Sequence, residues 1–198
     1  MRCRVIAFLD TAYYDDVTSR RPDHRPGLAV VAVHRGQVVA LCDVSLGGDD
    51  EATIETIAVH PEHRRSGLAT AMTDVLLPRL AHARVNRLHA WTRDDATALS
   101  WYENAGFEET FRYLHVYAST PEEAARNAGD DRRLMPRGAF FHAGIEHEAE
   151  LRRAYERVHV CRRLTRTLMR GPPEPSAATR QDDHGAATPP SQPREDSP

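Results

Sequence analysis

The stretch that decides the fold lies between Val59 and Ala69 and reads Val59-His60-Pro61-Glu62-His63-Arg64-Arg65-Ser66-Gly67-Leu68-Ala69. β-Branched residues dominate Thr53 to His60, which is typical of a strand, and Pro61 ends that strand because it cannot donate to a sheet. Beyond Gly67, apolar residues return at helical spacings of three and four: Leu68, Met72, Val75, Leu76 and Leu80. The stretch predicts a strand, a loop and a helix, in which Pro78 should kink the last turn or end the helix early.

The start of this helix has the chemistry of a phosphate site. The first N–H groups of a helix have no partner within it, and the helix dipole favours an anion there. Gly67 lets the backbone approach a ligand closely, Ala69 keeps the next turn narrow, and Arg64 and Arg65 add positive charge. Glycine is also common in strand-to-helix turns that bind nothing, so this stretch alone leaves both interpretations open.

The residues before this stretch predict strands. The apolar run from Cys3 to Leu9 suggests a first strand, and Thr11 to Pro26 is a polar loop. Two further apolar runs, Leu28 to Val33 and Val38 to Leu46, are separated by four residues that include Gly36. Because glycine adopts a positive φ readily, these two runs predict a hairpin.

The residues after the helix alternate between strand and helix patterns. Asn86 to Trp91 and Phe107 to Tyr117 read as strands. Thr92, with Asp95 three residues on, resembles the N-cap of a helix between them, and Gly106 suits the left-handed residue after its end.

The C-terminal third is less regular. Thr120-Pro121-Glu122-Glu123 has the form of a capping box, which predicts a short helix to about Ala128. Ile145 to Glu156 reads as an amphipathic helix and Val158 to Leu164 as a final strand. Phe140-Phe141 lies in a loop-like stretch, where adjacent aromatic side chains could plug a groove or line a binding pocket.

These elements predict an α/β (α+β) fold with a mixed, mostly antiparallel sheet. At its centre a parallel strand–helix–strand unit surrounds Gly67, and helices flank the sheet. Residues 1–118 would form the core of the domain, and residues 119–170 a helical insertion with the final strand that completes the domain. Residues 171–198 contain no Leu, Ile, Val or aromatic residue, which predicts a disordered tail.

Composition narrows the class of protein. The chain has 198 residues, of which 40% are hydrophobic, and a formal net charge of −3. That charge argues against a protein that coats nucleic acid. Three scattered cysteines predict no disulfide framework, and no apolar run is long enough for a signal peptide or a membrane span. We expect a cytoplasmic protein without nucleic-acid or membrane partners.

A second motif supports the phosphate interpretation. Residues 98–107 read Ala98-Leu99-Ser100-Trp101-Tyr102-Glu103-Asn104-Ala105-Gly106-Phe107. With the first stretch it resembles the GNAT acetyltransferase superfamily. The phosphate loop of that family is matched by Arg64, Gly67 and Ala69, the preceding strand end by Val59 and Pro61, and the later segment by Ala98, Leu99, Tyr102, Gly106 and Phe107. The resemblance covers about Leu28 to Tyr117.

The resemblance implies that acetyl-coenzyme A is the co-substrate and that no metal is needed. Backbone groups of Ile57, Ala58 and Val59 would pair with its pantetheine arm. The loop and the first helical turn would hold its phosphates, through Arg64, Arg65, Ser66, Gly67, Leu68, Ala69 and Thr70. Asp95 occupies the position where the family often has a cofactor-contacting Asn. A carboxylate there would repel phosphates, so a role as a helix cap alone stays open.

The resemblance also implies direct attack of an amine on the thioester. A backbone N–H at the end of the strand would stabilise the oxygen that gains charge, and Tyr102 would donate to the departing sulfur. Glu55 is the candidate general base, acting through water. Both residues also have structural interpretations: Tyr102 as a packed aromatic residue, and Glu55 as a solvated strand residue.

The acceptor amine cannot be identified from the sequence, and either a small molecule or a protein fits. Regions 11–26 and 119–157 depart from the family where it usually shapes the acceptor site. A binding module that acts through its Arg-rich C-terminal region is the alternative function, and a longer acyl group is a third. His60 and His63 lack further ligands for a metal site. We also allow for a homodimer.

Overall fold

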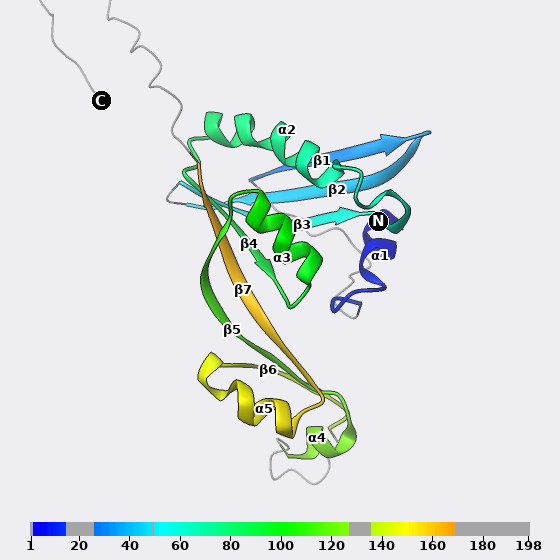
Figure 1. Ribbon diagram of the computed structural model, residues 1–198, viewed down its shortest axis with the longest axis vertical. Coiled ribbons are helices and arrows are strands. Elements are labelled where there is room, and N and C mark those ends of the chain that lie inside the picture. Colours follow the sequence, from blue (N-terminus) through cyan, green and yellow to red (C-terminus); the bar gives the residue numbers. More distant parts are fainter. Residues whose placement is uncertain (1, 15–25, 49, 127–135, 169–198) are drawn as a thin grey trace, which may run out of the picture.

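The computed structural model describes residues 2–14, 26–48, 50–126 and 136–168. Within these ranges it contains one seven-stranded sheet in the order β1-β2-β3-β4-β7-β5-β6 (Figure 1). Neighbouring strands are antiparallel except for β3 and β4, which are parallel, so the predicted mixed sheet is confirmed. The strands are β1 (Gly27–His34), β2 (Gln37–Leu46), β3 (Glu51–Val59), β4 (Arg87–Thr92), β5 (Glu108–Ala118), β6 (Ala139–Ala143) and β7 (Arg157–Thr167).

Strands β1 and β2 form the predicted hairpin. Its two turn residues, Arg35 and Gly36, have φ values of 49° and 76°. Two successive left-handed residues give the turn a twist that matches the twist of the two strands.

The parallel unit connects β3 to β4 through a helix. The 3-10 turn η1 (Pro61–His63) leads into α2 (Leu68–His82), which packs against β1, β2 and β3. The prediction that Pro78 ends this helix early is wrong, since the helix continues to His82. Leu76 and Leu80, on either side of Pro78, are both buried, and their packing offsets the one backbone hydrogen bond that proline cannot donate.

Helix α3 (Ala96–Asn104) begins three residues later than predicted, because its N-cap is Asp95 and not Thr92. Asp95 is its N-cap, because the Asp95 carboxylate accepts a hydrogen bond of 2.9 Å from the N–H of Ala98. Thr92, which the sequence suggested for this role, is the last residue of β4. Gly106 follows the helix with φ 78°, as predicted.

The C-terminal elements begin with the predicted capping box. Thr120 accepts from the N–H of Glu123, and the Glu123 carboxylate accepts from the N–H of Thr120, at the start of α4 (Pro121–Ala125). The predicted end of this helix near Ala128 and the predicted tail, residues 171–198, lie outside the described residues.

The segment around Phe140 and Phe141 is a strand and not the loop that the sequence suggested. It forms β6, in which Phe140 is exposed and Phe141 packs beside the core, the two-residue alternation of a sheet edge. The helix expected from Ile145 to Glu156 is shorter, and divides into the turn η2 (Ile145–His147) and α5 (Glu148–Ala154). The predicted final strand is β7, and it lies between β4 and β5.

The first segment is also corrected. The run from Cys3 to Leu9 is not a strand but helix α1 (Arg2–Phe8), which contacts β2 and β3. Its buried residues, Cys3 and Ala7, lie four apart, the spacing of one helical face. A short apolar run does not separate strand from helix by itself, and here the packing against the sheet decides.

The apolar core has two parts. The larger lies between the sheet and helices α2 and α3, and includes Leu76, Leu80 and Leu88. The smaller lies where β5 and β7 extend beyond the other strands, and α5 covers Leu114 and Val158 there (Figure 1).

Candidate active site

The candidate site begins where β3 and β4 separate. Their pairing ends at Ile54 opposite Ala90, and within the described ranges β3 has no partner on that edge beyond this point. On its other edge β3 stays paired with β2 as far as Val59. Backbone groups on the β4 side of residues 55–59 therefore remain open to a ligand that pairs like an added strand.

A cavity of about 720 Å³ lies beside this open edge. Its size is that of a small-molecule or cofactor pocket. The predicted site residues on its wall are Glu55, Ile57, Ala58, Val59, Arg64, Arg65, Gly67, Leu68, Ala69, Thr70, Asp95 and Tyr102. Ser66 is not on the wall, because its hydroxyl turns back and donates to the carbonyl of His63.

The loop before α2 is shaped by two left-handed residues. Arg65 has φ 61°, and Gly67, the N-cap of α2, has φ 78°. A side chain added at Gly67 would meet nothing within 4 Å, so the space beside it is open. The first helical bond runs from Ala71 to the Gly67 carbonyl, which leaves the N–H groups of Leu68 to Thr70 without helical partners on the cavity wall.

Arg64 lies on the wall but is bound to the protein itself. Its guanidinium donates to both carboxylate oxygens of Asp10, at 2.7 and 2.8 Å, and to the carbonyl of Ala7 at 2.9 Å. The hydrogen bond from Arg64 lowers the pKa of Asp10. Arg64 therefore ties the end of α1 to the loop before α2, an arrangement that the sequence did not reveal.

Tyr102 lies in the last turn of α3 and is 5% exposed. Its ring makes edge contacts with Trp101 and Phe107, with centroids 4.9 and 5.1 Å away. Burial raises the pKa of the phenol, so Tyr102 keeps its proton and acts as a hydrogen-bond donor. Tyr102 is one of the residues that line the cavity.

Glu55 lies at an irregularity in β3. Asp43 pairs with Thr56 while Val44 pairs with Ile54, so Glu55 is the extra residue of a β-bulge. Its side chain is exposed and accepts a 2.6 Å hydrogen bond from the Ser45 hydroxyl. The bulge changes the alternation of the strand at the point where β3 and β4 separate.

Asp95 also lies on the wall, and its carboxylate caps α3, so the predicted cap is confirmed.

Several other wall residues were not predicted as site residues. The Tyr13 hydroxyl accepts a 2.6 Å hydrogen bond from the N–H of Arg93, and the Trp101 indole donates to Thr70 at 3.1 Å. These partners lie far apart in the sequence, and only the fold brings them together. The wall residues not predicted for the site are Arg4, Ala7, Phe8, Thr11, Tyr13, Ile54, Thr56, His63, Trp91, Thr92, Thr97, Ala98 and Trp101.

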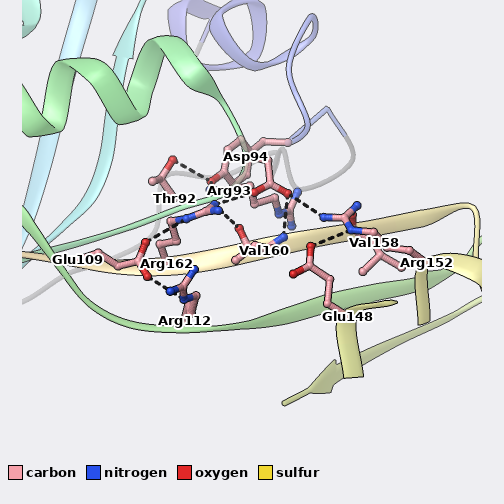
Figure 2. A network of polar contacts seen from close by, with 11 residues as sticks. Thr92, Arg93, Asp94, Glu109, Arg112, Glu148, Arg152, Val158, Val160 and Arg162 are labelled. Carbon is pink, nitrogen blue, oxygen red and sulfur yellow. Dashed lines mark hydrogen bonds and ion pairs between the residues drawn. The ribbon is translucent and has the colours of Figure 1, made fainter. Parts of the chain in front are cut away.

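A polar network fixes the connection between β4 and α3 (Figure 2). The Asp94 carboxylate accepts a hydrogen bond of 2.8 Å from the N–H of Val160 and one of 2.6 Å from the Arg162 guanidinium. It also forms an ion pair with Arg152 at 3.6 Å. Burial acts to raise the pKa of Asp94, but the bonds from Arg162 and Val160 outweigh it, and the pKa is lowered. Because Asp94 directly precedes Asp95, the network positions the start of α3 against β7.

The described part of the chain contains no group of three or more His, Cys, Asp and Glu side chains that could hold a metal ion. None of its helices is long and apolar enough to cross a membrane.

Comparisons with known proteins agree with this geometry. Residues 2–107 match the family model for the acetyltransferase (GNAT) family. The chain is 36% identical over 72 residues to the [ribosomal protein bS18]-alanine N-acetyltransferase of Escherichia coli (strain K12). That match covers 36% of this chain and 49% of the relative, so the chain spans about half the length of the curated relatives it matches.

One solved acetyltransferase structure shows the same fold. The crystal structure of the ribosomal-protein-S18-alanine N-acetyltransferase from Escherichia coli has a TM-score of 0.53 at 18% identity, and the match covers 87% of this chain and 88% of that one. A putative streptothricin acetyltransferase from Bacillus anthracis in complex with acetyl coenzyme A has a TM-score of 0.48 at 11% identity, over 72% of this chain and 64% of that one. Since the family model covers more than half of the 198 residues, the chain belongs to the GNAT family of acetyltransferases, which are acyltransferases.

Proposed function

We propose that this protein transfers the acetyl group of acetyl-coenzyme A to a primary amine, with both substrates bound at once. The observation that carries the proposal is the cavity between the separated strands β3 and β4. It combines an open strand edge, a helix N-terminus beside the empty space at Gly67, and the buried donor Tyr102. A long ligand with amides at one part and phosphates at another fits these features.

The residues that would hold the co-substrate follow from this arrangement. The open edge of β3 at Ile57 to Val59 would pair with the amides of the pantetheine arm. The N–H groups of Leu68 to Thr70 would bind the pyrophosphate, with Arg65 adding positive charge. Ser66 would contribute its loop geometry and not its hydroxyl, which is engaged by His63.

The chemistry requires a neutral amine and a proton for the leaving thiolate. Acetyl-coenzyme A supplies an acetyl group activated as a thioester: the amine nitrogen bonds to its carbonyl carbon, the carbon–sulfur bond breaks, and the sulfur gains a proton. Glu55 would accept the amine proton, directly or through water. Tyr102 would stabilise the sulfur mainly by a hydrogen bond, because its raised pKa makes full proton transfer to a thiolate more unfavourable.

The first acceptor to test is the α-amine of a protein. The curated relatives in the comparison acetylate an alanine of a ribosomal protein, and the only amine of alanine is its α-amine. Deprotonation at neutral pH costs about 1 kcal/mol for an α-amine, against about 4.6 kcal/mol for a lysine side chain. An exposed carboxylate such as Glu55 is sufficient for the smaller cost. A small-molecule amine remains the second acceptor class.

One observation favours the alternative of a binding module without chemistry. The guanidinium of Arg64, part of the phosphate motif, is engaged by Asp10 and Ala7. The proposed partner surface of that module, the Arg-rich C-terminal region, has less support. Two of its arginines, Arg152 and Arg162, are engaged by acidic residues within the chain (Figure 2).

A thermal-shift titration with acetyl-coenzyme A tests the proposal, with coenzyme A and ADP alongside. A ligand at 100 times its dissociation constant should stabilise the folded state by about 2.7 kcal/mol. Thiol release would then be followed with a peptide that begins with alanine, and the same peptide with a blocked N-terminus is the control. Binding with thiol release from the free peptide supports the enzyme, and binding without release from any amine supports the binding module. No shift at millimolar acetyl-coenzyme A contradicts the enzyme and makes the binding module the better supported function.

A further inference from the structure

Arg4 is a cation on the cavity wall that the proposed function does not use. It belongs to α1, the helix beside the end of β3 (Figure 1). Its Nε and Nη1 atoms are shielded from solvent and have no hydrogen-bond partner among the residues that the structure describes. A guanidinium does not lose its proton in proteins, so the positive charge is present while these two donors lack an acceptor.

Three acidic residues on or near the cavity wall have hydrogen-bond partners other than Arg4. Asp10 is held by Arg64, Glu55 by the Ser45 hydroxyl, and Asp95 by the N-terminus of α3. A buried charge without a partner is costly, and such groups are normally paired within the protein or with a ligand. Arg4 therefore has the properties of a residue whose partner arrives with the ligand.

We propose that Arg4 is an anion-binding residue of the cavity and pairs with a phosphate or carboxylate group of a bound ligand. The planar guanidinium suits both groups, because each can accept two parallel hydrogen bonds. The position of Arg4 is fixed from the other end of its helix, where Arg64 holds the Ala7 carbonyl and Asp10. An anion in the cavity is within reach of a side chain mounted in this way.

Two ligands of the cavity could supply the anion. One is a phosphate of acetyl-coenzyme A, and the other is an acidic group of the acceptor. The identity of these two ligands rests on the proposed function. The inference that Arg4 binds an anion does not. The helix N-terminus at Leu68 to Thr70 and Arg65 already provide a separate phosphate site, so Arg4 would add a second anion contact.

The test compares Arg4→Gln with Arg2→Gln, which removes an exposed arginine from the same helix. Calorimetry would measure the binding of acetyl-coenzyme A and of acetyl-pantetheine, which lacks phosphates. If Arg4 binds a cofactor phosphate, Arg4→Gln weakens acetyl-coenzyme A binding roughly 10- to 100-fold, the usual loss for a charged hydrogen bond, and leaves acetyl-pantetheine unchanged.

If Arg4 instead binds the acceptor, the cofactor affinities stay the same. The KM of Arg4→Gln then rises by a similar factor for a peptide that begins Ala-Glu, and stays unchanged for its Ala-Gln counterpart. Arg2→Gln should match the wild-type protein in both assays. Equal affinities and equal KM values for the two variants overturn the inference.

Stability separates this role from a structural one. Because Nε and Nη1 of Arg4 have no hydrogen-bond partner among the described residues, Arg4→Gln should melt at the wild-type temperature or above it. A clear drop in melting temperature would mean that the guanidinium supports the fold, and would overturn the inference. If wild-type protein does not bind acetyl-coenzyme A, the proposed function fails, and inorganic pyrophosphate then tests Arg4 alone. Weaker pyrophosphate binding by Arg4→Gln than by Arg2→Gln supports the inference, and equal binding overturns it.

Discussion

At the scale of single residues, Tyr102 is defined by its surroundings. Its ring packs between Trp101 and Phe107, and these contacts restrict the directions in which the hydroxyl can point. Burial raises its pKa, so the hydroxyl remains protonated at any pH at which the protein would be assayed. A fixed, permanently protonated donor on the wall of a cavity is suited to stabilising negative charge that develops on a ligand.

Replacing Tyr102 with Phe should therefore lower turnover without much change in cofactor affinity. The ring contacts stay in place, and only a hydrogen bond that strengthens as the sulfur gains charge is lost. We expect kcat to fall roughly 100-fold, the lower part of the range for a positioned proton donor, with the acetyl-coenzyme A dissociation constant within about a factor of two. Steady-state kinetics and calorimetry measure the two quantities.

Tyr113→Phe is the matched control for this variant. Tyr113 is also an aromatic residue with a raised pKa, to about 12, but it is not part of the cavity wall, and its hydroxyl contacts His115. It should retain wild-type kcat. If Tyr102→Phe behaves like Tyr113→Phe, Tyr102 is a packed aromatic residue with no part in the chemistry.

At the scale of elements, the junction of β3 and α2 depends on Gly67. Its φ of 78° is unfavourable for any residue with a side chain, and the space beside it is open. Gly36, in the turn between β1 and β2, has nearly the same φ, 76°, and is equally open. Both positions therefore require a residue that adopts a positive φ, but only Gly67 lies on the cavity wall.

Gly67→Ala and Gly36→Ala should each destabilise the protein by about 1 kcal/mol, because both force alanine into the left-handed region. Only Gly67→Ala should also weaken acetyl-coenzyme A binding, by roughly tenfold or more, which corresponds to about 1.4 kcal/mol. The added methyl group would occupy the space through which a phosphate reaches the helix N–H groups. Urea unfolding and calorimetry give both numbers. Equal cofactor affinities for the two variants would show that the phosphates bind elsewhere.

Elements governed by local chemistry could be predicted from the sequence. Three such features depend on residues within a few positions of one another: the hairpin turn at Gly36, the end of helix α3 at Gly106 and the capping box at Thr120. Helix α1 and strand β6 could not be predicted in this way. Both are short apolar segments whose conformation is decided by the sheet they pack against.

At the scale of the whole molecule, the two motifs meet across one cavity. The phosphate loop and the helix of Tyr102 are separated along the chain, yet both line the same wall, as the resemblance implied. What the sequence could not supply is the wall contributed by α1. Arg4, and the pairing of Asp10 with Arg64, depend on α1 lying against β3, a contact between residues more than fifty positions apart.

The long strands β5 and β7 carry a partly buried polar cluster that makes stability depend on pH. His115 accepts a hydrogen bond at Nδ1 from Arg93, and its Nε2 lies 2.8 Å from the Tyr113 hydroxyl. Its ring stacks on His142 at 5.1 Å. Burial, then the charge of Arg93, then His142 and His159 lower the pKa of His115 to about 4.

This shift has a defined sign. Between the ordinary histidine pKa of about 6.5 and the folded value of about 4, the unfolded chain binds a proton at His115 and the folded chain does not. The neutral ring therefore stabilises the fold above about pH 6.5, and this stability is lost as the pH falls toward 4. At pH 5 the loss amounts to at most about 2 kcal/mol, since the ring is partly exposed and solvent screens the charges.

His115→Gln should remove this part of the pH dependence. Glutamine can still accept a hydrogen bond from Arg93 but does not titrate, so the difference in unfolding free energy between pH 7 and pH 5 should shrink. Urea unfolding at the two pH values measures it, with the exposed His34→Gln as the control. Some dependence should remain, because burial also lowers the pKa of His159. A pH dependence that is equal in wild type, His115→Gln and His34→Gln would mean that the cluster opens and lets His115 accept its proton without cost to the fold.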